Sequence, residues 1–118
     1  MSEGIIEAQR PTEEPQDPFL AEIVRRLVEV YQPERIYLFG STARGEAGPD
    51  RDYDLMVVVS DETPPQLRDS SRAYEALWGL PRSGDILVWT RTAFDCRLHL
   101  KASLPSTILR EGKLLHAG

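Results

Sequence analysis

The chain has little of several residue types that define common classes of site and fold. It has one cysteine, Cys96, among 118 residues, so it can form neither an internal disulfide nor a zinc site built from several cysteines. No apolar run approaches the roughly 20 residues that a membrane-spanning helix needs, and no signal peptide precedes the domain. We therefore expect a soluble, cytoplasmic protein in which Cys96 is a small core residue.

Basic residues and histidines are also scarce. Lysine and arginine number 14 against 19 acidic residues, for a formal net charge of −5. Nucleic-acid recognition usually needs a basic surface that releases counterions, so we expect no direct binding to nucleic acid. The two histidines, His99 and His116, have no neighbouring ligand pattern, and we expect a helix-surface residue and a tail residue.

The length predicts a single small domain. With 41% hydrophobic residues, 118 residues can bury a core but leave no room for a second domain. Residues 1–16 are polar and carry Pro11 and Pro15 among acidic residues, which is typical of a flexible lead-in. The folded domain is therefore expected to span residues 17–118.

Alternating strand and helix patterns predict an α/β (α+β) fold, with a mixed sheet flanked by helices. Strands are expected at residues 35–39, 53–59, 84–89 and 113–116, and helices at 18–31, 64–78, 92–101 and 105–110. In the second helix, the residues expected to cover the sheet are Leu67, Tyr74, Leu77 and Trp78. Thr92 is expected to cap the third.

A turn after the first expected strand favours phosphate binding. Gly40 has no side chain and allows the chain to turn sharply. If a helical turn follows, its free N–H groups attract a phosphate, with the Ser41 hydroxyl and the Arg44 guanidinium as further donors. Arg44 has an equal alternative as a surface residue paired with Glu46 or Asp50. The glycine spacing resembles a P-loop, but Glu46 stands where that motif requires lysine, which excludes the ATPase interpretation.

Three aspartates predict a metal site. Asp52 and Asp54 are two residues apart on an expected strand, which separates their side chains by about 6 to 7 Å on one face and lets both reach a magnesium ion or an ion pair. Asp85 heads a later apolar run that could lie beside the Asp54 strand. An Asp-x-Asp pair alone is common in solvated loops, so the prediction depends on all three aspartates together with the Gly40–Ser41 turn.

This combination resembles the minimal nucleotidyltransferases of the polymerase-beta-like superfamily, over nearly the whole chain. Arg51 departs from the family, which often has serine there. The resemblance implies a nucleotidyltransferase fold and metal-dependent transfer of a nucleoside monophosphate, expected to be AMP from ATP, with Mg²⁺ or Mn²⁺. It implies that Asp52, Asp54 and Asp85 hold the metal, with Asp85 also a candidate general base. Gly40, Ser41 and Arg44 would bind the triphosphate.

The resemblance also implies a partner. Short members of the family are antitoxins that pair with a HEPN ribonuclease toxin and transfer AMP to a tyrosine of that toxin, whereas larger relatives carry an added helical domain for the acceptor. We therefore expect a hetero-oligomer with a HEPN-type toxin. One alternative is a catalytically idle antitoxin or binding module that neutralises its partner by complex formation alone. A free-standing enzyme acting on a small alcohol is another.

Overall fold

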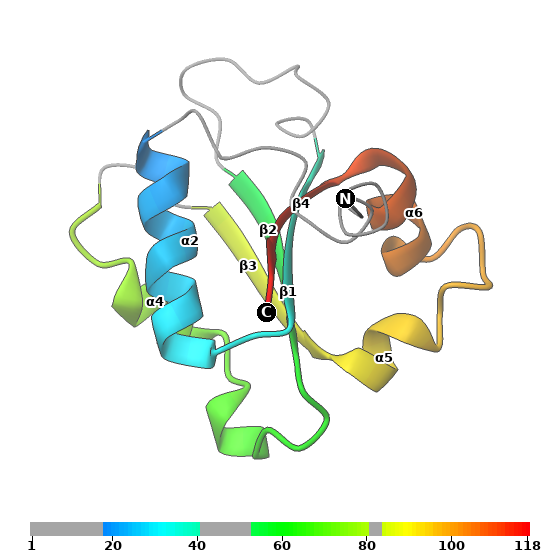
Figure 1. Ribbon diagram of the computed structural model, residues 1–118, viewed down its shortest axis with the longest axis horizontal. Coiled ribbons are helices and arrows are strands. Elements are labelled where there is room, and N and C mark those ends of the chain that lie inside the picture. Colours follow the sequence, from blue (N-terminus) through cyan, green and yellow to red (C-terminus); the bar gives the residue numbers. More distant parts are fainter. Residues whose placement is uncertain (1–17, 41–52, 81–83) are drawn as a thin grey trace, which may run out of the picture.

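A four-stranded mixed sheet forms the centre of the fold (Figure 1). The computed structural model describes residues 18–40, 53–80 and 84–118, so the expected lead-in lies outside the described residues. The elements in chain order are α2 (Pro18–Tyr31), β1 (Arg35–Phe39), β2 (Tyr53–Val59), the 3₁₀ helix η1 (Pro65–Leu67), α4 (Ser71–Ala76), β3 (Gly84–Thr90), α5 (Arg91–Asp95), α6 (Leu104–Glu111) and β4 (Lys113–Ala117). The predicted mixed sheet with flanking helices is confirmed.

The strand order brings the ends of three strands together at one end of the sheet. The order is β3-β2-β1-β4, in which β1 is antiparallel to β2 and to β4, whereas β3 is parallel to β2. The carboxyl end of β1 therefore lies beside the amino ends of β2 and β3. Gly40 follows β1, and Asp54 and Asp85 lie near the beginnings of β2 and β3. The fold therefore gathers these three residues at the same end of the sheet.

Helices cover both faces of the sheet (Figure 1). On one face, α2 and α4 enclose a core that includes Ile23, Leu27 and Leu55; on the other, Phe94 of α5 and Ile108 of α6 are fully buried against the sheet. Residues 55–59 of β2 are at most 1% exposed because this central strand is covered on both sides. A continuous apolar run, rather than an alternating one, is what such a strand requires.

The expected helix over 64–78 is wrong in its extent. The structure has η1 and then α4, separated at residues 68–70. At this break the Asp69 carboxylate accepts a hydrogen bond of 2.9 Å from the N–H of Ser71, the first residue of α4, a local bond that competes with a continuous helix. Leu77 is buried as expected, whereas Leu67, Tyr74 and Trp78 are 41%, 45% and 86% exposed. Leu77 is the C-cap residue of α4 and Trp78 lies in the turn that follows, so the expected helical pattern does not extend to Trp78.

The expected helix over 92–101 is shorter and begins earlier. Thr90, not Thr92, is the cap of α5, and its side chain accepts a hydrogen bond of 3.2 Å from the N–H of Ala93. Cys96 follows the helix and is exposed, so the expected core cysteine is wrong. The last helix and strand are confirmed, with Ser103 capping α6 and Gly112 ending it. No helix in the described ranges has the length and apolarity to cross a bilayer.

Candidate active site

Two of the three predicted carboxylates are neighbours in the sheet. In the parallel register of β2 and β3, Asp54 lies opposite Asp85, and paired strands are about 4.8 Å apart. Met56 and Leu87, each two residues further along, pack in the core under α5 and α6. Both aspartates therefore project from that same face, where Asp54 is half-buried and Asp85 is exposed.

Gly40, which follows β1, lies directly against the Asp54 carboxylate. Gly40 has a φ of +78°, and a Cβ built there would lie 2.4 Å from Asp54 Oδ2. A separation under 3.0 Å is closer than atoms of this kind approach each other. Glycine is needed here both for the backbone conformation and for the space. The structure thus places Gly40, the first residue of the predicted phosphate-binding turn, next to Asp54, a predicted metal ligand.

Gly84 is a residue that the sequence reasoning missed. A Cβ at this position would lie 1.7 Å from the carbonyl oxygen of Tyr53, so the chain just before Asp85 lies against the chain just before Asp54. Any side chain at Gly84 would push the two strands apart where the two aspartates stand. The signal in the sequence was a glycine immediately before a carboxylate at the start of an apolar strand.

The remaining predicted site residues lie outside the described residues. These are Ser41, Arg44 and Asp52. Within the described ranges, no group of three or more histidine, cysteine, aspartate or glutamate side chains is arranged to hold a metal ion. Gly40, Asp54 and Asp85 are therefore the predicted site residues whose arrangement the structure gives, and their catalytic roles stay predictions.

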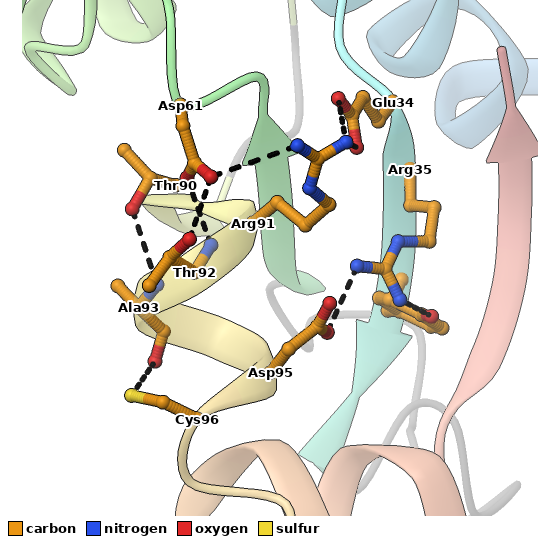
Figure 2. A network of polar contacts seen from close by, with 10 residues as sticks. Glu34, Arg35, Asp61, Thr90, Arg91, Thr92, Ala93, Asp95 and Cys96 are labelled. Carbon is orange, nitrogen blue, oxygen red and sulfur yellow. Dashed lines mark hydrogen bonds and ion pairs between the residues drawn. The ribbon is translucent and has the colours of Figure 1, made fainter.

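A separate polar network lies at the opposite end of the strands (Figure 2). Arg91 forms an ion pair of 3.1 Å with Glu34 and another of 3.6 Å with Asp61, just past the end of β2. Arg35, at the start of β1, pairs with Asp95 at 3.1 Å. These contacts fasten α5 to the ends of β1 and β2. We assign this network a structural role, because its charged groups are paired with one another.

The network predicts a pH dependence of stability. The Thr92 hydroxyl and backbone N–H donate to Asp61 at 2.6 and 2.9 Å and, with Arg91, lower the pKa of this carboxyl. A pKa that is lower in the folded state stabilises the fold above the unfolded-state pKa, and this contribution is lost as pH falls through the folded-state pKa. We expect the Asp61→Asn variant to be less stable at neutral pH and to lose less stability in acid.

Urea unfolding of both proteins between roughly pH 6 and pH 3 measures this difference, since the usual aspartate pKa is about 3.9. Glu62→Gln removes the same charge from the next position, which is also exposed, and serves as the control. Parallel pH profiles for wild type and Asp61→Asn would contradict the prediction.

The chain matches a known domain family and is similar to solved structures. Residues 20–115 match the nucleotidyltransferase domain family. A crystal structure of a toxin–antitoxin with AMP-PNP is similar to this chain at 25% identity and a TM-score of 0.55, covering 82% of this chain and 72% of that one. A search of curated proteins gave no match.

A second solved structure shows the fold alone. It is the toxin–antitoxin MntA–HpeT, in a mutant with two aspartates, two positions apart, changed to glutamate. It has 20% identity and a TM-score of 0.52, and covers 80% of this chain and 71% of that one.

Proposed function

The chain belongs to the nucleotidyltransferase domain family, and from this premise we propose that it transfers AMP from ATP to a tyrosine hydroxyl of a HEPN-type toxin, and so acts as the antitoxin. The observation that carries the proposal is the pairing of Asp54 with Asp85 beneath the Gly40 turn. The similar toxin–antitoxin crystallised with AMP-PNP, an ATP analogue, supports both the nucleotide and the kind of partner. Residues 17–118 are proposed as the nucleotidyltransferase domain.

The carboxylate oxygens at the end of the sheet where β2 and β3 begin suit a hard divalent cation. Asp54 and Asp85 offer carboxylate oxygens on adjacent strands, which Mg²⁺ and Mn²⁺ prefer over the nitrogen and sulfur ligands that softer metals select. Two carboxylates side by side also repel each other unless a cation or a proton lies between them. We propose that Asp52, Asp54 and Asp85 hold the ion. When bound, it would polarise the phosphoryl group and offset charge on the departing pyrophosphate.

The protein residues would then bind the triphosphate, place its α-phosphorus and accept a proton. The Gly40 turn, with Ser41 and Arg44, would bind the triphosphate and hold its α-phosphorus over the Asp54 face of the sheet. Asp85 would accept the proton of the acceptor hydroxyl. The hydroxyl oxygen would then attack the α-phosphorus in line, forming a phosphodiester and breaking the bond to the β-phosphate. The products are AMP linked to the toxin and free pyrophosphate.

The decisive experiment uses ATP labelled at two different positions. The chain is incubated with magnesium and a co-expressed HEPN toxin, once with ATP labelled in the α-phosphate and once in the γ-phosphate. We expect only the α-label on the toxin, with AMP on a tyrosine by mass spectrometry. Transfer of the γ-label would indicate a kinase. A silenced but unlabelled toxin would overturn the enzymatic proposal in favour of neutralisation by complex formation alone.

A further inference from the structure

Tyr74 of α4 contacts the strand that carries Asp85. β3 is at one edge of the described sheet, so β2 supports it on one side only. On β3, the N–H of Ile86 donates a hydrogen bond of 3.2 Å to the Tyr74 hydroxyl. Ile86 immediately follows Asp85, so this bond holds the backbone one residue away from the proposed general base.

Tyr74 itself is held on a fixed support. The Tyr31 hydroxyl of α2 donates to the carbonyl oxygen of Asp69, before α4, at 2.6 Å. At the other end, Arg26 of α2 donates to the carbonyl oxygen of Ala76 at 3.0 Å. Between them Ala73 is completely buried against α2 and the sheet. α2 thus anchors α4 at both ends, and the Tyr74 side chain reaches β3 from a rigid position.

This arrangement has a catalytic consequence. A general base acts only when it lies within hydrogen-bond reach of the proton it removes, and small displacements are costly. Asp85 stands at the beginning of an edge strand and is exposed, so its placement depends on how firmly the first residues of β3 are held. Among the described contacts, β2 holds these residues on one side by strand pairing, and the Tyr74 hydroxyl holds them on the other by its hydrogen bond to Ile86.

We propose that Tyr74 is a positioning residue for the transfer reaction, which acts through Ile86 to keep Asp85 aligned with Asp54. This inference rests on the proposed function, because it takes Asp85 as the base. The Tyr74 hydroxyl touches neither substrate nor metal in this account. Its removal therefore slows the chemical step and leaves ATP binding intact.

The test is a Tyr74→Phe variant, which keeps the ring and removes only the hydroxyl. We expect kcat to fall about tenfold with KM for ATP unchanged, and hydrogen exchange at the Ile86 amide to become faster. The matched control is Tyr37→Phe, which also removes a hydroxyl with one hydrogen bond, of 3.1 Å from Arg35, on the opposite face of the sheet. It should change neither the Ile86 exchange nor kcat.

Activity and exchange together distinguish the possible failures. A wild-type chain without transfer activity overturns the proposed function and the role of Tyr74 with it. An active wild type with an equally active Tyr74→Phe variant overturns only the inference. The inference is also overturned if Ile86 exchange is unchanged, or if Tyr37→Phe lowers kcat as much as Tyr74→Phe does, because the effect would then be a general loss of rigidity.

Discussion

The Asp54→Asn variant is expected to lose transfer of AMP by about 10³-fold or more, since a missing metal ligand removes several kcal/mol of transition-state stabilisation. The amide keeps the size of the side chain beside Gly40 but removes its charge. The fold should persist, with a melting temperature within about 3 °C of wild type. The measurement is the rate at which α-labelled ATP labels the toxin, together with thermal unfolding.

Asp61→Asn is the matched control for this variant. Asp61 follows the other end of the same strand and belongs to the structural network around Arg91. Its substitution removes one carboxylate and leaves the end of the sheet that carries Asp54 and Asp85 unchanged. We expect this variant to keep transfer activity near wild type at neutral pH. Full activity of Asp54→Asn would show that the reaction does not use this carboxylate.

The Gly40→Ala variant is expected to be the second most damaging. Alanine would have to adopt a φ of +78° with its Cβ 2.4 Å from Asp54 Oδ2, so either the turn or the carboxylate must move. The left-handed backbone alone costs about 1–2 kcal/mol of stability. Displacement of the carboxylate adds a loss of activity of about 10²-fold, the usual consequence of a shift near 1 Å in a catalytic group.

Gly79→Ala separates the two effects. Gly79 also has a left-handed backbone, with φ +91°, but a Cβ there meets no atom within 4 Å. Both variants should therefore lose similar stability in urea unfolding, while only Gly40→Ala loses transfer activity. If Gly79→Ala lost as much transfer activity as Gly40→Ala, backbone strain alone would account for the damage. The closeness of position 40 to the Asp54 carboxylate would then not be its cause.

Much of the fold was predictable because its strands are strongly patterned. The apolar run at 55–59 and the run after Gly84 gave correct strands, as Pro18 and Gly112 gave correct helix limits. The sequence could not show the break at residues 68–70, where the Asp69 side chain bonds to the backbone N–H of Ser71. Nor could it show which of Leu77 and Trp78 would face the core, since both are apolar and α4 ends before them, at Ala76.

For the candidate site, the sequence predicts which residue types take part, and this stays a prediction; their arrangement needs the structure. The sequence suggested Asp54 and Asp85 as partners, but their register depends on the pairing of β2 with β3, to which Gly84 contributes by lying against Tyr53. The contact between Gly40 and Asp54 is equally a product of the antiparallel pairing of β1 with β2, in which Phe39 lies opposite Asp54. Tyr74 carried no catalytic signal in the sequence, because its hydroxyl acts on a backbone amide 12 residues away.

The exposure of Trp78 gives the protein a natural optical reporter. Trp78 is 86% exposed and borders an open groove of about 550 Å³ with Tyr74 and Leu80, whereas Trp89 is half-buried with the Arg97 guanidinium over its ring. Indole fluorescence shifts to shorter wavelength when water is excluded from the ring. A Trp89→Phe variant would therefore report any molecule that covers the groove through the emission of Trp78 alone, without a chemical label.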